Sequence, residues 1–246
     1  MKTTIVNMSL ILNMLISIIV FSSPFSEDKL TPHICSGLQE PDSIQNRQEL
    51  YNGIKWTNRY RKFDVSQFLF SDLFLQGTVT MNSKTYDNIR LKYDIVNDEI
   101  ITPVNLEDIV QLNKEMVDSF SLQYDGRKYN FVNIKNDTLN NFSGYIQQLY
   151  SGRSSLFVKY NKSFSTSDDM NSDGTFNETQ TIYFITEGLI YPITGIRTLY
   201  KVLMPDLIDE VKDYIRESRL KVSKKNPASF IDVIRYYDAI SHINTD

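Results

Sequence analysis

Apolar and polar residues alternate with a period of two through the middle of the chain, and this alternation restricts the fold more than any other feature. In residues 89–95 every second position is apolar: Ile89, Leu91, Tyr93 and Ile95. Short polar turns interrupt the pattern at residues 82–84 and 97–99. Alternation between such turns is typical of antiparallel hairpins with one face against a core and the other in water.

Further strand-like pieces continue to residue 193. Residues 109–112 and 117–122 are two of them, and hairpins are predicted around residues 124–126, 151–154 and 187–188. Asp or Ser followed by Gly favours the positive φ angles of tight turns. The 15 Tyr and 14 Phe residues favour strands as well. We therefore predict about ten strands.

After Ile193 the period changes to that of a helix. An apolar stripe with helical spacing occupies residues 196–203, and Thr194 is its predicted N-cap. Pro205 opens a second amphipathic stretch, and Asn226 is predicted to cap a third. The end of the chain therefore predicts about three short helices.

Strands followed by helices predict an α+β fold. We expect an antiparallel, curved sheet of about ten strands in residues 49–193. About three short helices in residues 194–241 are expected to pack on this sheet. The two parts are expected to form a single domain over residues 49–241.

The first 23 residues have the pattern of a secretory signal peptide. Lys2 is followed by an apolar run from Met8 to Phe21 and then by small residues. The run is shorter than the ~20 residues that span a bilayer. We therefore expect an extracytoplasmic protein, periplasmic or secreted, which meets the membrane only through its signal peptide during export. Residues 24–48 are predicted to be an extended lead-in, and its single cysteine, Cys35, cannot form an internal disulfide.

Three stretches of the chain look familiar in combination. They are the hairpin FLFSDLFLQGTVTMNSKTYDNIRLKYDIVNDEII, the strand pair YSGRSSLFVKY and the ending YPITGIRTLYKVLMPDLIDEVKDYIRESRL with VIRYYD. Together they resemble a family of exported proteins of Bacteroidota-type bacteria that has no assigned activity. The resemblance covers most of residues 49–241 and is not concentrated in a catalytic motif. It implies an extracytoplasmic single domain and transfers no functional residues.

Histidine and cysteine are too rare for several classes of enzyme. The two histidines, His33 and His242, lie in the lead-in and close to the C-terminus, where no general base would be held against a nucleophile. Zinc sites need clustered Cys and His, and no P-loop or dinucleotide-binding glycine motif occurs. The net charge of −4 does not favour a nucleic-acid partner. We expect no cofactor, triad hydrolase, zinc site or nucleotide site.

Carboxylates are the catalytic groups that remain. Most lie at turns or on helix exteriors, where they are solvated surface charges. Asp72 and Asp94 differ because apolar residues surround them in the sequence, so burial could raise their pKa. The alternative for both is an Asp that caps a turn by accepting hydrogen bonds from nearby backbone.

Aromatic and basic residues alternate in residues 54–63. Trp56, Tyr60 and Arg59 form the candidate ligand-binding set, since aromatic rings with basic neighbours can stack on sugars or hold anions. The alternative is an alternating strand with the rings in the core and the basic side chains outside.

Residues 169–174 match the first half of a calcium loop. Asp169, Asn171 and Asp173 occupy the first three ligand positions, but Gln180 stands where a bidentate Glu should complete the site. The flanking segments are strand-like rather than helical. We therefore expect the exposed tip of a hairpin, and the calcium site stays a weak alternative.

Two functions remain. The first is an exported, non-catalytic envelope or extracellular domain that binds a partner, a glycan or a hydrophobic ligand. The second is a carboxylate-dependent hydrolase of envelope or extracellular polymers. The first is favoured because the polar residues form no convergent set.

Overall fold

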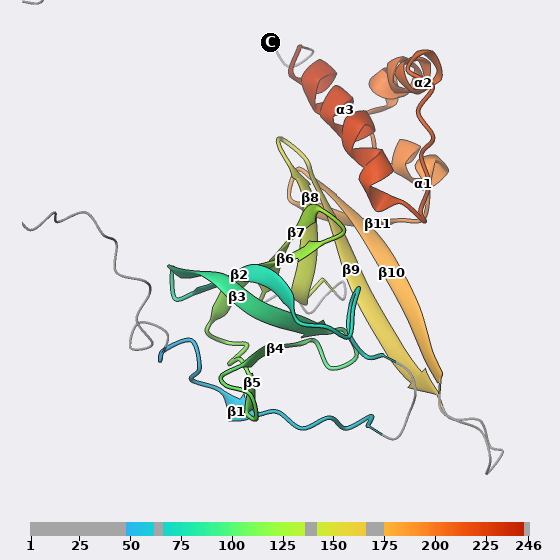
Figure 1. Cartoon of the computed structure of the whole chain (residues 1–246). Coiled ribbons are helices and arrows are strands. Elements are labelled where there is room, and N and C mark those ends of the chain that lie inside the picture. Colours follow the sequence, from blue (N-terminus) through green and yellow to red (C-terminus); the bar gives the residue numbers. More distant parts are fainter. Residues whose placement is uncertain (1–47, 62–65, 136–141, 166–174, 244–246) are drawn as a thin grey trace, which may run out of the picture. The chain divides into compact units, whose positions relative to one another are not determined.

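The computed structural model describes residues 48–61, 66–135, 142–165 and 175–243 (Figure 1). All of them belong to one compact unit, which spans Asp42–Asp246. No helix within these ranges is both long and apolar enough to cross a membrane. The expected signal peptide and Cys35 lie outside the described residues, as does nearly all of the lead-in.

The described residues form one open antiparallel sheet of eleven strands. The strands are β1 (Ile54–Lys55), β2 (Leu75–Met81), β3 (Lys84–Asp94), β4 (Glu99–Pro103), β5 (Ile109–Gln111), β6 (Val117–Tyr124), β7 (Arg127–Ile134), β8 (Gly144–Ser151), β9 (Ser155–Ser165), β10 (Thr175–Thr186) and β11 (Leu189–Ile193).

Strand β2 pairs with β3 on one side and with β6 on the other. β3, β4 and β5 follow on one side, with β1 at that edge. The chain then returns, so that β6 pairs with the other side of β2, and β7 to β11 continue outward in chain order. Two arms of consecutive hairpins therefore meet at the β2–β6 pair.

Tight turns join the strands where the sequence predicts them. The central residues of three two-residue turns have φ angles between 48° and 75°: Asn82 and Ser83, Asp125 and Gly126, and Glu187 and Gly188. Positive φ at both central residues gives a hairpin turn whose twist matches that of its strands. The predicted turns at residues 82–84, 124–126 and 187–188 are confirmed.

The sheet curves enough to bring β9 back to the end of β3. The backbone N–H of Lys162 donates to the carbonyl oxygen of Ile95 over 3.1 Å. The Nζ of Lys162 donates to the carbonyl oxygens of Ser66 (3.0 Å) and Phe68 (2.8 Å). In Figure 1, β9 and β10 run steeply across the direction of β2 and β3. The predicted curved antiparallel sheet is confirmed.

Inward-facing side chains of β2 to β8 form the first hydrophobic core. Four buried rings meet at its centre with centroids 4.6 to 5.8 Å apart: Tyr93, Phe120, Phe131 and Tyr145. Edge-to-face and offset contacts of this kind add stability beyond that of apolar burial. Side chains therefore fill this part of the curved sheet.

The C-terminal helices pack on the far end of the sheet. They are α1 (Ile196–Tyr200), α2 (Ile208–Glu217) and α3 (Ile231–Ile243), with 3-10 turns η2 (Pro205–Leu207) and η3 (Pro227–Phe230) before the last two. Their apolar sides join strand residues such as Leu156, Ile182 and Phe184 in a second core. The expected α+β architecture, a curved antiparallel sheet followed by three short helices packed on it, is confirmed.

The predicted N-cap of the first helix is wrong by one residue. Gly195, not Thr194, precedes α1, and no side chain caps it from outside. Instead Thr198, inside the helix, accepts hydrogen bonds from the backbone N–H groups of Thr194 (2.8 Å) and Gly195 (3.1 Å). A hydroxyl at the third position of the helix thus reaches back to the N-cap N–H, as the N3 side chain does in a capping box.

One carboxylate holds α3 against the β8–β9 turn. Asp238 accepts hydrogen bonds from the N–H (3.0 Å) and Oγ (2.6 Å) of Ser154 and from the hydroxyl of Tyr150 (3.1 Å). A Cβ at Gly152 would lie 2.7 Å from Asp238 Oδ2, so the turn needs glycine to approach the helix this closely. Asp238 therefore joins sheet and helix through a buried polar contact.

The β9–β10 hairpin is longer than the sequence predicts. Residues 175–180 were expected in the exposed tip, but they belong to β10 and pair with residues 160–165 of β9. Phe164 and Phe176 face each other in this extension, with ring centroids 5.2 Å apart. The calcium candidates Asp169, Asn171 and Asp173 lie outside the described residues.

Candidate functional site

Asp94, a catalytic candidate, is completely buried and fully bonded. It accepts hydrogen bonds from Gln67 Nε2 (2.7 Å), from the N–H groups of Val96 (2.9 Å) and Asn97 (3.0 Å), and from Asn97 Nδ2 (2.8 Å). A carboxylate that accepts this many hydrogen bonds is held in place and turned away from solvent. Asp94 therefore shapes the turn between β3 and β4.

Asp72, the other catalytic candidate, is exposed in the segment before β2. It accepts a hydrogen bond from Ser66 Oγ over 2.5 Å. Glycosidases need two carboxylates that face each other across a substrate cleft. One buried turn residue and one exposed loop residue do not make this arrangement, so the hydrolase hypothesis loses the support that these two residues lent it.

The aromatic and basic candidates of residues 54–63 contact different parts of the protein. Trp56 packs on Phe68, with ring centroids 6.0 Å apart. Tyr60 packs on Phe164 (5.5 Å) and Phe176 (5.1 Å) in the long hairpin. Arg59 donates to Asn97 Oδ1 (3.3 Å) and lies 3.7 Å from Glu99 Oε1. The structure therefore uses these side chains to tie the segment before β2 to the sheet.

Asp98 is the centre of a charged cluster that sequence reasoning did not select. Its carboxylate accepts from the hydroxyl of Tyr93 (2.7 Å) and pairs with Nζ of Lys114 (2.6 Å) and of Lys159 (3.3 Å). Lys159 Nζ also donates to the carbonyl oxygen of Ser143. These contacts join the β3–β4 turn to β9 and to the loop before β6.

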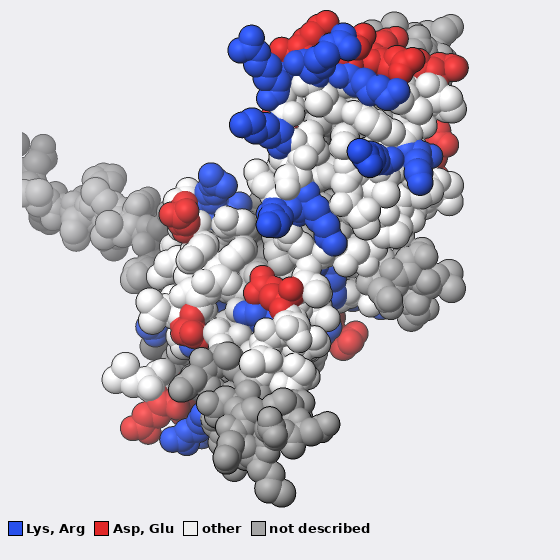
Figure 2. Space-filling model, turned by 90° about the vertical axis from the view of Figure 1, so that its right-hand side faces the viewer, with Lys and Arg blue, Asp and Glu red and all other residues white. Residues whose placement is uncertain are grey.

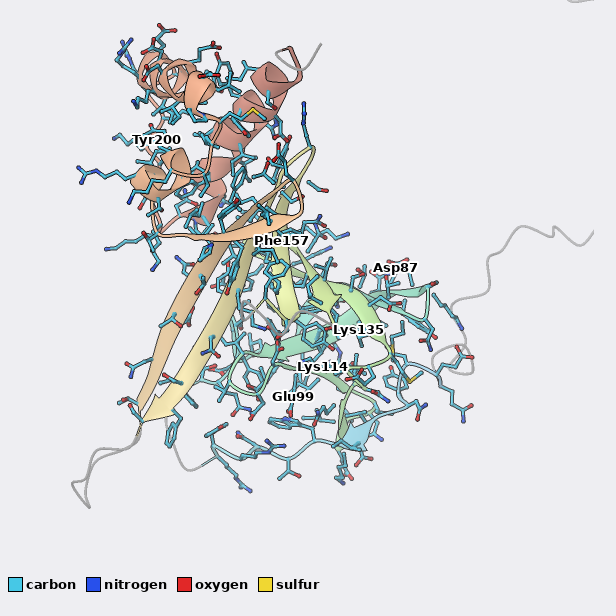
Figure 3. The ribbon with its side chains drawn as sticks, turned by 180° about the vertical axis from the view of Figure 1, so that it is seen from behind. Asp87, Glu99, Lys114, Lys135, Phe157 and Tyr200 are labelled. Carbon is cyan, nitrogen blue, oxygen red and sulfur yellow. The ribbon has the colours of Figure 1, made fainter. Side chains whose placement is uncertain are left out.

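Burial sets the ionisation of the groups around Asp98. It lowers the pKa of Lys159, and the negative charge of Asp98 opposes this shift. It raises the pKa of Tyr93 well above its ordinary value, and the pKa of Glu99 is raised by burial too. Glu99 and Lys114 lie near each other in Figure 3. The two lysines and Tyr93 are all bound to the Asp98 carboxylate, so the cluster holds the β3–β4 turn against β9 and the loop before β6.

The two arms of the sheet separate beyond the Gly77–Leu122 pair, where the β2–β6 ladder ends. From there β2 continues with β3 alone, and β6 continues with β7 alone. A Cβ at Gly77 would lie 1.9 Å from the carbonyl oxygen of Ser121, so only glycine allows the strands to meet this closely. We name the opening beyond this pair the fork.

The fork holds an open groove of about 560 Å³. Its walls carry two aromatic rings, two amides and several charged side chains on exposed positions. The lining residues are Phe74, Leu75, Gln76, Gln123, Tyr124, Asp125, Gly126, Arg127 and Lys128. The lining is balanced between polar and apolar groups, which favours ligands that present both.

A strained backbone segment supports the aromatic wall of the fork. Phe70 has a φ of 67°, and the N–H of Ser71 donates to the carbonyl oxygen of Leu69 over 2.9 Å. This geometry is a γ-turn with positive φ at a non-glycine residue, and such residues cost on the order of 1–3 kcal/mol. The Phe70 ring stacks on Tyr124, with centroids 5.1 Å apart and planes at 5°.

Tyr124 keeps part of its surface free although Phe70 covers one face of its ring. The residue is 38% exposed, whereas most rings of the first core are buried. Phe70 also contacts Tyr129 (4.4 Å) and Tyr160 (6.2 Å). Phe70, itself held by Tyr129 and Tyr160, therefore fixes Tyr124 in one orientation at the edge of the fork, and a rigid ring binds at low entropic cost.

Lys92 adds a positive charge beside the fork. Its Nζ lies 4.6 Å from the ring centroids of both Phe68 and Phe74. Burial lowers the pKa of Lys92, and the charge of Asp72 opposes the shift. A cation between two aromatic faces is stabilised by their negative electrostatic potential. The contact with Lys92 thereby holds the Phe74 ring in the wall of the groove.

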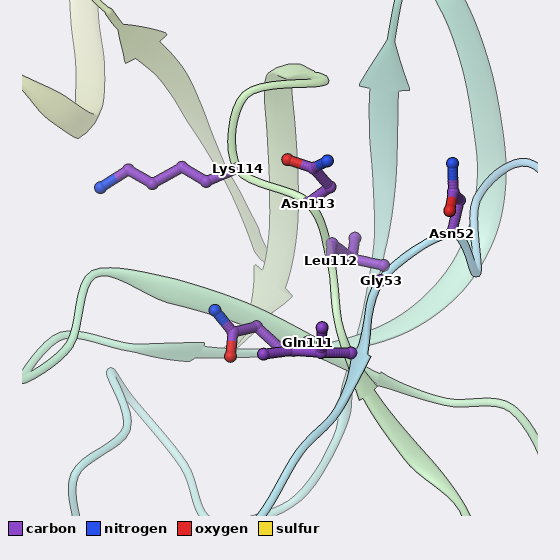
Figure 4. A pocket seen from close by; sticks show the side chains of 7 residues that line it. Asn52, Gly53, Gln111, Leu112, Asn113 and Lys114 are labelled. Carbon is purple, nitrogen blue, oxygen red and sulfur yellow. The ribbon is translucent and has the colours of Figure 1, made fainter.

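Two other grooves lack aromatic rings free to stack. One of about 420 Å³ lies beside β1 and the loop of Asn113 and Lys114, and in Figure 4 the Lys114 side chain points away from Asn52. The other, of about 160 Å³, lies between α3 and the β8–β9 turn, where Asp238 is already bonded. The fork is therefore the better candidate for a ligand.

No group of three or more His, Cys, Asp or Glu residues suited to a metal ion occurs within the described ranges. The groove is lined by one carboxylate, Asp125. The groove thus offers aromatic surfaces for stacking and amide and charged groups for hydrogen bonds.

The sequence signal for the fork was faint. The turn at residues 124–126 was predicted, but the pairing of β2 with β6 joins residues up to 45 positions apart, as at Gly77 and Leu122. Local patterns do not report such a pairing. Gln76, Gln123 and Tyr124 therefore gave no sign of lying together.

Comparisons of the chain with protein-family models, with curated proteins and with solved structures gave no match. The resemblance to exported proteins of Bacteroidota-type bacteria therefore stays a prediction.

Proposed function

We propose that the chain is an exported, non-catalytic domain that binds a glycan in the fork. The observation that carries the proposal is the open groove between β2 and β6, whose lining includes the ring of Tyr124 and the amides of Gln76 and Gln123. Aromatic faces stack on the apolar faces of sugar rings, and amides exchange hydrogen bonds with hydroxyls.

A hydrophobic ligand fits the structure less well. Carriers of such ligands enclose them in apolar cavities. The inner face of β2 to β8 is instead filled by its own rings, and the fork is open and half polar. An extended glycan, which stays partly hydrated, needs no enclosure.

Export is the cellular part of the proposal. It rests on the signal-peptide pattern of residues 1–23 and on the resemblance to exported proteins. A periplasmic or secreted domain meets the polysaccharides of the envelope and its surroundings, which are the glycans this groove would encounter.

Affinity electrophoresis of the purified full chain tests the proposal. The protein is run in native gels that contain soluble neutral or acidic polysaccharides, and a fluorescent fatty acid is tested separately. We expect retardation by at least one polysaccharide and no binding of the fatty acid. Binding of the fatty acid alone would overturn the glycan assignment.

Tyr124→Ala is the decisive variant. We expect it to weaken glycan binding by about tenfold or more, which corresponds to ~1.4 kcal/mol. Tyr214→Ala is a matched control, since Tyr214 stacks on Tyr236 in the helices with centroids 4.1 Å apart and planes at 3°. An equal loss in both variants would show that the fork is not the site.

A further inference from the structure

Four polar side chains form a row across the fork, one from each of four neighbouring strands. Arg90 of β3 lies directly opposite Gln76 of β2, and Gln123 of β6 lies directly opposite Lys128 of β7. Directly opposite residues point to the same face of a sheet. The Gly77–Leu122 pair places Gln76 and Gln123 at corresponding positions on the two sides of the fork.

This polar row lies on the outer face of the sheet. Its neighbours along the strands, Gly77, Leu91 and Leu122, are buried on the inner side, so side-chain alternation turns the row outward. All four residues of the row are exposed. At about 4.8 Å between strands, the row is at least ~14 Å long, which suits an oligosaccharide rather than one sugar.

The charge of the row is positive although the chain as a whole is negative. Arg90 and Lys128 stand at its two ends, and Lys92, two residues from Arg90 in β3, points to the same face. Asp125 lies in the turn that lines the groove, and Asp72, whose charge acts on Lys92, is bonded to Ser66. The formal charge of the chain is −4, so this positive surface runs against the overall balance.

The cations of the row also lack partners within the described part of the chain. Elsewhere on the sheet, exposed lysines pair with carboxylates: Lys55 with Asp108, Lys84 with Glu49 and Lys135 with Asp118. Arg90, Arg127 and Lys128 form no ion pair with any residue that the structure describes. Their charge is available to a ligand.

We propose that the ligand of the fork is an acidic polysaccharide whose carboxylates are bound by Arg90 and Lys128. This rests on the proposed glycan-binding function. Gln76 and Gln123 lie between the two cations and contact hydroxyls, while the ring of Phe74, which lies under Lys92, contacts a sugar face. Arg90 can hold a carboxylate with two parallel hydrogen bonds.

A nucleic acid is a different anionic polymer and a competing occupant. Single strands are bound by bases stacking on successive aromatic rings along a basic groove. Here one ring, Tyr124, is exposed, and Phe74 is half-buried under Lys92. Amides at the middle of the row match hydroxyl groups better than stacked bases, so the row favours the glycan.

The test compares polygalacturonate with its fully methyl-esterified form, using the purified full chain in titration calorimetry. The two polymers share a backbone and differ in charge. We expect polygalacturonate to bind at least about tenfold more tightly than the ester. We also expect its binding to weaken from low to physiological salt, since exposed charges are screened. A uridylate oligomer is titrated under the same conditions.

Arg90→Gln/Lys128→Gln is the matching variant. We expect it to lose the preference for the acid form while keeping any binding of the ester. Arg197→Gln/Lys221→Gln removes two exposed cations from the C-terminal region and serves as the charge-matched control. Unfolding in urea checks that both variants keep the stability of the unmodified chain.

The outcomes separate the two proposals. Equal binding of both polymers, or loss of preference in the control variant as well, overturns the acidic ligand but leaves glycan binding in place. Binding of a neutral polysaccharide in the native gels without binding of polygalacturonate also overturns the acidic ligand and leaves glycan binding in place. Failure of every polysaccharide overturns both proposals, and so does tighter binding of the uridylate oligomer.

Discussion

The two ends of the sheet differ in how many of their faces are covered. Strands β2, β3, β6 and β7 have one face on the first core and an outer face of Thr, Ser, Gln, Arg and Lys. Strands β8, β9 and β10 have buried side chains on both faces: one face packs against the helices, and on the other Phe142, before β8, packs on Phe157 and Tyr183. The free outer face lies where the fork opens.

The charged surface follows the same division. In Figure 2 acidic and basic side chains gather together over the C-terminal helices at the top, while the surface below them is mostly uncharged. On α2 and α3 the charges neutralise one another in pairs, such as Lys212 with Asp209 and Arg235 with Asp232. The charged side chains of α2 and α3 therefore form ion pairs within their own helices.

Truncation of a buried ring at the helical end should have the largest effect. Phe230, the last residue of η3 and the one before α3, is completely buried. We expect Phe230→Ala to lower the free energy of unfolding by about 3–5 kcal/mol. Phe70→Ala, at the fork, is the comparison and should cost clearly less, since the ring is half-buried and its backbone strained. Equal losses of unfolding free energy in the two variants, measured in urea, would contradict the inference that the helical end of the sheet contributes more to stability than the fork.

Neutralising the carboxylate at the centre of the charged cluster should have the next largest effect. Asp98→Asn leaves Lys159, whose side chain is 20% exposed, without its counter-charge. We expect a loss of about 2 kcal/mol, less than for a fully buried pair. Asp118→Asn breaks the exposed pair with Lys135 and should cost under about 1 kcal/mol. A smaller loss of stability for Asp98→Asn than for Asp118→Asn would show that the Asp98 cluster does not stabilise the fold in this way.

Alkaline pH should act mainly through the first core. Burial raises the pKa of Tyr93, Tyr145 and Tyr160 above the ordinary value near 10. Above that pH the unfolded chain loses protons that the folded chain keeps, so stability is complete below about pH 10 and falls as the pH rises.

Each such tyrosine contributes a slope of about 1.4 kcal/mol per pH unit. Tyr160→Phe should therefore make the fall of the free energy of unfolding with pH less steep by about 1.4 kcal/mol per pH unit. Urea unfolding at several pH values above about 10 measures this slope. A slope unchanged by this variant would mean that Tyr160 ionises in the folded chain.

The smallest effect concerns two hairpin turns. Asp125 and Glu187 both have positive φ and both precede glycine. Asn and Asp tolerate this conformation better than Glu does. We expect Glu187→Asn to raise the free energy of unfolding by about 0.5 kcal/mol and Asp125→Asn to change it little. A loss of stability in Glu187→Asn would show that the Glu187 side chain makes a stabilising contact of its own.

Local patterns predicted most of the secondary structure because its causes are local. Alternation placed the strands, glycine-containing turns placed the hairpins, and the change of period placed the helices. One error arose where another strand intervened, since residues 175–180 form a strand because β9 pairs with them. The other error is local: Gly195 rather than Thr194 precedes α1, and the Thr198 hydroxyl accepts from the N–H of Gly195.

The candidate site could not be predicted in the same way. Asp94 was chosen for its apolar neighbours, yet its partner Gln67 is 27 residues away and holds it in a turn. Trp56 and Tyr60 were chosen for their sequence, but contacts with Phe68 and Phe164 decide their role. The side chains that line the fork are ordinary strand and turn residues until their strands are paired.

The sequence by itself determined the α+β class, the positions of the hairpins and the absence of clustered histidine and cysteine, because each depends on neighbours along the chain. Only the tertiary structure decided that β2 would pair with both β3 and β6 and then part from β6 beyond Gly77. That pairing depends on which distant strands bury the same core. The fork, its polar row and the ring of Tyr124 all follow from it.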